Sequence, residues 1–242
     1  DVDKKFDGDD QMLIMRESVT LSTLDHQSIV KFYGISFRSF EDEAILQPSI
    51  LTEYVPNGSL MDILEKERKG LTQIEWSATK KCICLLGVAH AMKYLHEHGI
   101  LHLDLKPENI LIDGEYYPKV CDFGLSRCFP QSLTKSMRLA TQSQVGTPLY
   151  MAPELLENRE KYEYSSGVDV YAFSMIAYEI CSGKAPFSEL GDITNSELKR
   201  RILGGYRPKF TEFVTENMRK LLQKCWSGTI EDRPSFKEIF KT

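Results

Sequence analysis

Four side chains suited to phosphate chemistry stand close together in the middle of this sequence. Asp104, Lys106 and Asn109 lie within one short stretch, and Asp122 follows thirteen residues after Asn109 as the first residue of Asp-Phe-Gly. Carboxylate and amide oxygens are ligands that Mg²⁺ accepts in nucleotide sites. A lysine ammonium can neutralise phosphate charge, and a carboxylate can orient an attacking hydroxyl. These residue types and their spacing therefore predict a magnesium–nucleotide site beside a hydroxyl acceptor.

Short apolar runs on both sides of these residues must position them. We expect short strands over residues 100–102, 110–112 and 119–121, which leaves the first three polar residues in the loop between the first two strands. Residues 125–150 are polar, rich in Ser and Thr, and lack periodicity. This composition predicts a mobile surface segment next to the site.

The first 56 residues predict a strand-rich unit with one helix. Loose helical spacing of apolar residues indicates a helix over residues 10–24, and two β-type runs follow at residues 29–37 and 45–54. Pro56-Asn57-Gly58-Ser59 is a strong turn signal. We therefore place the boundary between two lobes there.

The rest of the chain predicts a mainly helical unit. We expect helices over residues 59–66, 72–98, 169–182, 196–203, 215–225 and 235–240. The predicted class is α+β, with a small β-rich lobe over residues 1–56 and a larger helical lobe over residues 57–242. The chemistry would lie at the seam between them.

The composition indicates which classes of partner the protein is not expected to bind. The chain has 242 residues, a formal net charge of −5 and a pI of about 5.6. A mildly acidic protein has no general attraction for nucleic acid or anionic membranes, so we expect no nucleic-acid partner. No apolar run approaches the roughly 18 residues of a membrane span, and the N-terminus is not a signal peptide. We therefore expect no membrane insertion and a cytoplasmic location, while oligomeric state has no signal in the sequence.

Cysteine and histidine spacing does not favour a metal site or a disulfide framework. The six cysteines form no C-x-x-C pair, so we expect reduced and mostly buried thiols. His96 and His98 are separated by one residue near a helix end. No third ligand is suggested for zinc, so we expect surface or capping histidines there.

Taken together, the chain resembles the eukaryotic protein kinases over nearly its whole length. The motifs that carry the resemblance occur in the family's order: Glu17, His102-Leu103-Asp104, Lys106, Asn109, Asp122-Phe123-Gly124, Ala152-Pro153-Glu154, Asp169 and Arg233. The resemblance implies a two-lobed kinase fold, ATP and Mg²⁺ as cofactors, and protein substrates. Residues 122–154 would then form the activation segment.

The same resemblance implies roles for the central residues. Asp104 would be the catalytic base, and Lys106 would contact the γ-phosphate. Asp122 would bind the magnesium that bridges the nucleotide phosphates, and Asn109 would complete a second metal site.

Further roles implied by the resemblance lie around this centre. Adenine would lie against a hinge with Thr52 as gatekeeper, backbone groups near Glu53 and Val55 as hydrogen-bond partners, and Leu111 beneath the ring. Lys4 would bind the phosphates, and Glu17 on the following helix would pair with Lys4. Structural roles would fall to an apolar stack and two anchors: Leu21, Phe32, His102 and Phe123 for the stack, Asp169 for the catalytic loop, and Glu154 with Arg233 as an ion pair.

The acceptor class follows from a mixture of signals. In the resemblance, Lys106 with Thr147 marks serine/threonine kinases and disfavours a tyrosine kinase. The hinge Thr52-Glu53-Tyr54-Val55 and the ending Cys225-Trp226…Arg233-Pro234-Ser235-Phe236 resemble tyrosine kinases instead. This mixture is typical of the tyrosine-kinase-like group, which implies transfer to protein Ser and Thr hydroxyls in intracellular signalling.

Two departures concern the nucleotide. There is no G-x-G-x-x-G, and Gly8 is the only glycine before Gly34, so we expect the phosphate-covering loop to lie upstream of this sequence. The alternative is a domain that lacks this loop. Lys4 follows Val2 and Asp3, where the family would have a smaller residue and an apolar residue. The alternative to a phosphate-binding Lys4 is that Lys4 and Lys5 are two solvated lysines at a frayed chain end.

A third departure concerns regulation. Leu103 replaces the arginine that in the family pairs with a phosphorylated activation-loop residue. We expect any dependence on such phosphorylation to be weak or to use other cations such as Arg127. The alternative function is a pseudokinase that acts as an interaction scaffold. The departures favour the scaffold, and the central carboxylates, lysine and amide favour the enzyme.

Overall fold

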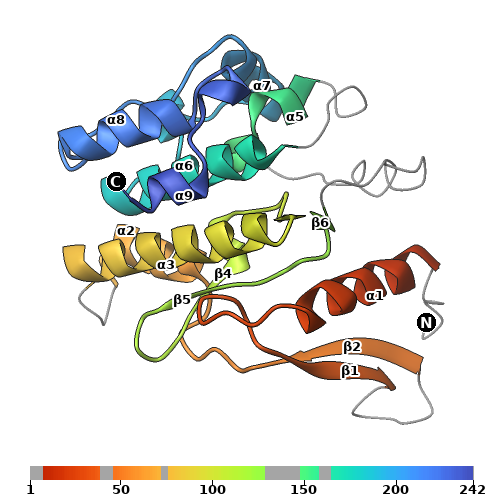
Figure 1. Ribbon diagram of the computed structural model, residues 1–242. Helices are drawn as coiled ribbons and strands as arrows, with labels where there is room; N and C mark the ends of the chain where they lie inside the picture. The colour runs from red at the N-terminus through yellow and green to blue at the C-terminus, as the bar shows by residue number, and fades with distance from the viewer. Residues whose placement is uncertain (1–7, 39–45, 72–75, 129–147, 158–164, 242) are drawn as a thin grey trace.

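A smaller part of the protein, built of one helix and a strand pair, lies beside a larger helical part (Figure 1). The computed structural model describes residues 8–38, 46–71, 76–128, 148–157 and 165–241. The arrangement of helices and strands confirms the predicted α+β class. None of the helices in these ranges is long and apolar enough to cross a membrane.

The smaller part contains helix α1 (Gly8–Ser22) and the antiparallel strands β1 (Phe32–Arg38) and β2 (Leu46–Thr52). Ile35 lies opposite Ile50 in the middle of the pair. The predicted helix and both strands are therefore present, with ends shifted by a few residues.

The first strand begins later than predicted because its first residues pair elsewhere. Val30 N–H donates to Val120 O at 3.0 Å, and Val120 N–H donates to Ser28 O at 2.8 Å. Val120 ends strand β5 (Pro118–Val120) of the larger part. The segment before β1 is thus bonded to the larger part, although its neighbours in sequence belong to the smaller one.

The next two helices start where polar side chains cap them. In α2 (Leu60–Arg68), Ser59 and Asp62 form a capping box that satisfies backbone N–H groups at the first turn. Helix α3 (Ala78–Glu97) starts after Ser77, whose hydroxyl accepts Lys80 N–H. The prediction of a helix from residue 72 was therefore wrong at its start, while residues 72–75 lie outside the described ranges.

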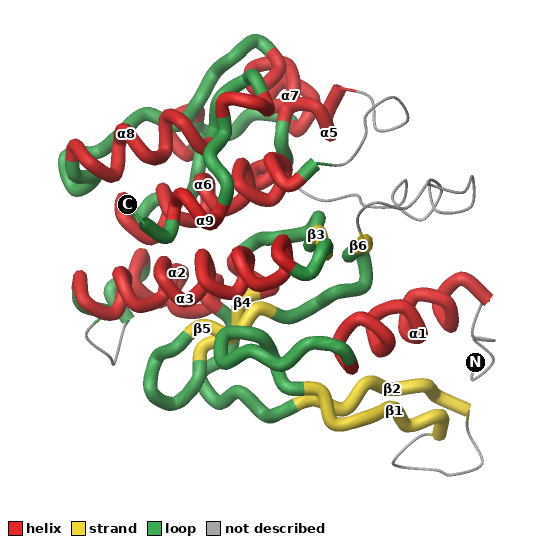
Figure 2. The backbone as a smooth tube through the Cα atoms, viewed as in Figure 1, coloured by secondary structure: helices red, strands yellow, loops and turns green. Residues whose placement is uncertain are grey.

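Helix α6 (Ser166–Ser182) forms the centre of the larger part. Nearly all of its residues are buried, as expected for a helix that is apolar all round. Figure 2 shows further helices above and below it. These are α5 (Pro153–Glu157), α7 (Asn195–Leu203), α8 (Glu216–Cys225) and α9 (Phe236–Ile239), together with α3.

Short strands and turns carry the central residues. Strand β4 (Ile110–Ile112) pairs with β5, and β3 (Ile100–Leu101) pairs with β6 (Arg127–Cys128). Strand β6 and the 3₁₀ turn Pro148–Tyr150 lie near the two ends of the segment predicted to be mobile, so the structure has short regular elements there. Residues 129–147 lie outside the described ranges. Three more 3₁₀ turns span Pro107–Asn109, Ser188–Leu190 and Ile230–Asp232.

Free thiols occur at five cysteines: Cys82, Cys84, Cys121, Cys181 and Cys225. Cys84 and Cys225 are buried, Cys121 and Cys181 are partly buried and Cys82 is exposed, so the expectation of mostly buried thiols fails at Cys82 alone among these five. Burial raises the pKa of the Cys84 and Cys225 thiols to about 12. No cluster of metal-ligating side chains occurs among the described residues.

Candidate active site

Asp169 of α6 holds the loop that carries the first three central residues. Its carboxylate accepts the N–H of His102 at 3.0 Å and the N–H of Leu103 at 2.9 Å. Burial raises the pKa of Asp169, but the hydrogen bond from His96, the electrostatic effect of His96 and His102, and the His102 N–H outweigh it and lower that pKa. An ionised carboxylate buried under the loop thus anchors it, as predicted.

His96 belongs to this anchor, which sequence reasoning missed. Its Nε2 lies 2.8 Å from the Asp169 carboxylate, and the side chain is mostly buried. The expectation of a surface or capping residue was therefore wrong for His96. It is confirmed for His98, whose backbone caps α3 and whose ring bonds to Tyr94 O.

His102 links the loop to the Asp-Phe-Gly segment. Its Nδ1 accepts Asp104 N–H at 3.3 Å, so its Nε2 donates to Cys121 O at 3.1 Å. The ring centroid lies 5.2 Å from that of Phe123, and both side chains are fully buried. This contact belongs to the predicted apolar stack, since Leu21 is buried in the same core and Phe32 packs against it.

Asp104, Lys106 and Asn109 form one hydrogen-bonded cluster. Lys106 Nζ lies 2.6 Å from Asp104 Oδ2, and Asn109 Nδ2 donates to Asp104 O at 2.8 Å and to Asp104 Oδ2 at 2.9 Å. Both amide hydrogens of Asn109 are therefore used. Its carbonyl oxygen Oδ1 stays available as a ligand, which fits the predicted metal role.

Asp122 and Glu17 meet beside this cluster. Asp122 is exposed and has a φ of +63°, and its Oδ1 accepts Gly124 N–H at 3.4 Å. Glu17 Oε1 accepts Phe123 N–H at 3.3 Å. Burial, followed by the charge of Asp122, raises the pKa of Glu17, and the Phe123 N–H partly offsets this. Two neighbouring carboxylates favour binding of a cation.

We expect Glu17→Gln to stabilise the nucleotide-free protein near neutral pH. The raised pKa means that folded Glu17 binds its proton more tightly than the unfolded chain does, so stability falls as pH rises above the ordinary value of 4.5. Gln cannot ionise and avoids this loss. Urea unfolding should show a higher midpoint for the variant at neutral pH and a smaller difference in mild acid.

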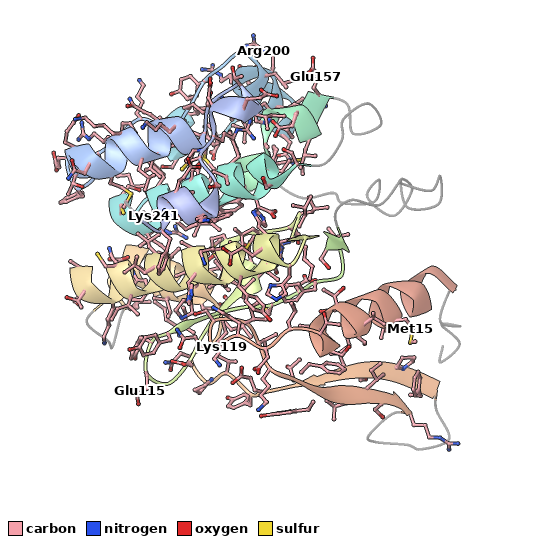
Figure 3. The ribbon with its side chains drawn as sticks, viewed as in Figure 1. Met15, Glu115, Lys119, Glu157, Arg200 and Lys241 are labelled. Atoms are coloured by element: carbon pink, nitrogen blue, oxygen red, sulfur yellow. The ribbon has the colours of Figure 1, made fainter. Side chains whose placement is uncertain are left out.

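The matched control for that measurement is Glu115→Gln, at an exposed position on a turn (Figure 3). Its midpoint should stay close to that of the unmodified protein at both pH values. A midpoint for Glu17→Gln below the unmodified protein at neutral pH would show that ionised Glu17 is stabilising.

The predicted hinge residues lie at the junction of the two parts. Thr52 ends β2 and is exposed, while Val55 is buried. Glu53 N–H donates to Lys31 O at 2.8 Å, and Glu53 Oε1 accepts Lys31 N–H at 2.9 Å. Leu111 in β4 is half-buried and bridges to Ser59 just after the hinge.

Lys119 also holds the hinge, and sequence reasoning missed it. Its Nζ lies 2.8 Å from Glu53 Oε1, and both side chains are mostly buried. Figure 3 shows Lys119 between the strand pair and the helical part. The predicted adenine-binding residues are thus tied to the strand that leads into Asp122.

Leu103 supplies a backbone contact rather than a cation. Its φ is +67°, a left-handed conformation that costs a non-glycine residue roughly 1–2 kcal/mol. The N–H bond to Asp169 and the packing of the side chain against the core compensate for it. No charge stands at this position to meet a phosphate.

Two ion pairs, one buried and one with an arginine at the surface, hold the end of the activation segment. Arg233 makes the predicted ion pair with Glu154, and the contact is bidentate, at 2.7 and 2.9 Å. Glu179 of α6, which sequence reasoning missed, accepts a hydrogen bond from Tyr150 OH at 2.6 Å and pairs with Arg68 at 2.7 Å. Burial and the Glu179 charge raise the pKa of Tyr150.

The structure therefore brings most of the predicted site residues together. Asp104, Lys106 and Asn109 are in mutual contact, and Glu17 and Asp122 meet at the Phe123 backbone. Lys4 and Thr147 lie outside the described residues.

Comparison with known proteins points to one family. Residues 2–242 match the family described as protein kinase domain. The chain is 34% identical over 242 residues to Serine/threonine-protein kinase VIK of Arabidopsis thaliana, which covers 97% of this chain and 51% of that protein. It is 35% identical over 195 residues to Dual specificity protein kinase shkB of Dictyostelium discoideum, a match that covers 80% of this chain and 28% of that protein.

A third relative is RGS domain-containing serine/threonine-protein kinase A of Dictyostelium discoideum, 31% identical over 224 residues. That match covers 93% of this chain and 18% of the relative. The chain thus spans at most about half the length of these curated relatives.

Proposed function

Because the chain belongs to the protein kinase family, we propose that it is an active serine/threonine kinase that transfers the γ-phosphate of ATP to protein hydroxyls. The observation that carries this proposal is the cluster of Asp104, Lys106 and Asn109, with contacts of 2.6 to 2.9 Å. Phosphoryl transfer needs positioning and charge neutralisation rather than covalent catalysis. A carboxylate held by an ammonium and an amide supplies both.

The donor set also suits magnesium. Asp122 offers an exposed carboxylate, and Asn109 offers its remaining carbonyl oxygen. Oxygen donors of these two types are the ones that Mg²⁺ prefers, and bound Mg²⁺ would neutralise charge on the nucleotide phosphates. Asp104 would orient the acceptor hydroxyl and receive its proton, and Lys106 would contact the transferred phosphate.

Serine and threonine are the proposed acceptors. Lys106 stands two residues after the base, as in the serine/threonine kinases that the chain resembles, and two of the three relatives named above are called serine/threonine kinases. The third is called a dual specificity kinase, so tyrosine belongs in the test.

Three peptides that differ only in the acceptor residue, which is Ser, Thr or Tyr, should distinguish serine/threonine transfer from tyrosine transfer. With magnesium and ATP, the protein should phosphorylate Ser and Thr peptides and leave the Tyr peptide unmodified. Asp104→Asn should lower the rate on Ser and Thr by about 10²- to 10⁴-fold, the usual loss when a general base is removed. Initial rates of phosphopeptide formation measure both effects.

The alternative is a pseudokinase that acts as an interaction scaffold, and Leu103 is the observation that favours it. A scaffold would give no magnesium-dependent transfer to any of the three peptides, and Asp104→Asn would change nothing. Transfer to the Tyr peptide alone would contradict the proposed acceptor class while keeping the enzyme.

Regulation should differ from that of kinases with an arginine at position 103. We expect alanine or glutamate at Ser132, Thr134, Ser136, Thr141 and Ser143, replaced one at a time, to change the peptide rate only modestly. The reason is that leucine cannot pair with a phosphate. A change of several orders of magnitude at one of these positions would show that another cation, such as Arg127, takes the role.

A further inference from the structure

Two histidines join the smaller part to helix α3. His26 lies in the segment between α1 and β1, and His90 lies in the middle of α3. His26 Nε2 is 3.2 Å from His90 Nδ1, with the rings edge-to-face at 4.5 Å. Tyr94 stacks on His26 at 4.9 Å, and Phe240 stacks on His90 at 5.1 Å. In Figure 1 the chain between α1 and β1 runs below α3.

Hydrogen bonds determine where the protons sit. Ser28 N–H donates to His26 Nδ1 at 3.1 Å, so Nδ1 carries no proton and neutral His26 has its proton on Nε2. That proton points at His90 Nδ1, which must accept it. His90 then carries its own proton on Nε2. The whole arrangement requires both imidazoles to be neutral.

Uptake of one proton breaks this arrangement at either ring. A proton on His26 Nδ1 would face Ser28 N–H, and a proton on His90 Nδ1 would face the Nε2–H of His26. Each case sets two donors against each other in a half-buried place. The contact between the two rings therefore exists in the neutral state only.

Neighbouring groups favour the neutral state of His26. Burial, followed by His90, lowers its pKa, Asp25 on the same segment raises it, and Lys93 on α3 lowers it. Tyr94 OH accepts Asp25 N–H at 3.2 Å, and the His98 ring lies 4.1 Å from that of Tyr94. A lowered histidine pKa means that the unfolded or opened segment binds more protons. The stabilisation that neutral His26 gives to the folded segment is therefore complete above pH 6.5, the ordinary pKa of histidine, and it is lost as pH falls.

We propose that the His26–His90 pair is a proton-sensitive tether that holds residues 23–31 against α3 near neutral pH and releases them in mild acid. The held segment is also bonded to Val120, two residues before Asp122, and to Glu53 of the hinge through Lys31. Release would therefore loosen the junction of the two parts where the proposed nucleotide site lies.

The first test is imidazole nitrogen NMR on the unmodified protein near neutral pH. We expect His26 and His90 both to be neutral, each with its proton on Nε2. Amide hydrogen exchange of residues 23–31 should then lose protection as pH falls below about 6.5, by up to about tenfold per pH unit for one proton, after correction for intrinsic exchange. Neither measurement requires kinase activity.

The second test is His26→Asn. An asparagine Oδ1 can accept the N–H two residues on, as in an Asx turn, and it does not titrate. Protection of residues 23–31 should then be independent of pH. His98→Gln is the matched control, and it should keep the pH dependence of the unmodified protein because His98 is exposed and caps α3.

Two outcomes would overturn the tether. One is a proton on His26 Nδ1 near neutral pH. NMR of the unmodified protein detects it, so this test does not depend on whether His26→Asn folds. The other is an unchanged loss of protection in acid for His26→Asn, which would place the proton-sensitive group elsewhere.

Discussion

Asp122→Asn is expected to lower magnesium-dependent phosphotransfer by at least about a hundredfold, the effect of removing one group that stabilises charge in a transition state. Asparagine keeps the shape of the side chain and loses the charge that would hold Mg²⁺. The fold should survive, because Asp122 is exposed and the hydrogen bond that it accepts from Gly124 N–H is long, at 3.4 Å. Removing its charge also relieves the repulsion of Glu17.

The measurement is binding of Mg-ATP and transfer to a Ser/Thr peptide at several magnesium concentrations. Asp192→Asn is the control, because Asp192 is exposed and far along the chain from the site. It should behave like the unmodified protein. Equal magnesium dependence for Asp122→Asn and Asp192→Asn would exclude the proposed metal role of Asp122.

Arg233→Met is expected to cost about 3–5 kcal/mol of unfolding free energy, the usual loss when one partner of a buried ion pair is removed. The Arg233 side chain is fully buried and makes two contacts with Glu154. It also donates to Ser227 O at 3.0 Å and to Gly167 O at 2.9 Å. Methionine leaves the Glu154 charge and two carbonyl groups without these donors.

Equilibrium urea unfolding measures this loss, and two further variants identify its cause. Arg233→Met combined with Glu154→Gln should recover part of the stability, because no unpaired charge then stays buried. Arg200→Met removes an arginine that pairs with Glu197 on the surface, with 74% of its side chain exposed. Its midpoint should barely move. A similar loss for Arg200→Met and Arg233→Met would contradict the burial argument.

The sequence predicted the fold class and most elements from local patterns. The helix around residues 10–24 and the two strands after it were visible as periodicity, and each lies within a few residues of its predicted place. Helix starts were less accurate where a single capping residue decides them, as Ser77 does for α3. The strand predicted from Ile29 starts at Phe32, since residues before it pair with β5 rather than β2.

The candidate site could be predicted where its members share one stretch of chain. Asp104, Lys106 and Asn109 lie in one loop, so their spacing alone brought them within reach of each other. Arg233 and Glu154 are far apart in sequence, and their pairing was predicted from the family resemblance, not from spacing.

What the sequence by itself determined is the set of chemical groups and the local elements that carry them, because both depend on residue type and short-range spacing. Only the tertiary structure decided the contacts of His96 with Asp169, Lys119 with Glu53, and His26 with His90. These partners are 73, 66 and 64 residues apart. Such pairs depend on how separate elements approach in space, and a side chain that faces a neighbouring element has the same local pattern as one that faces water.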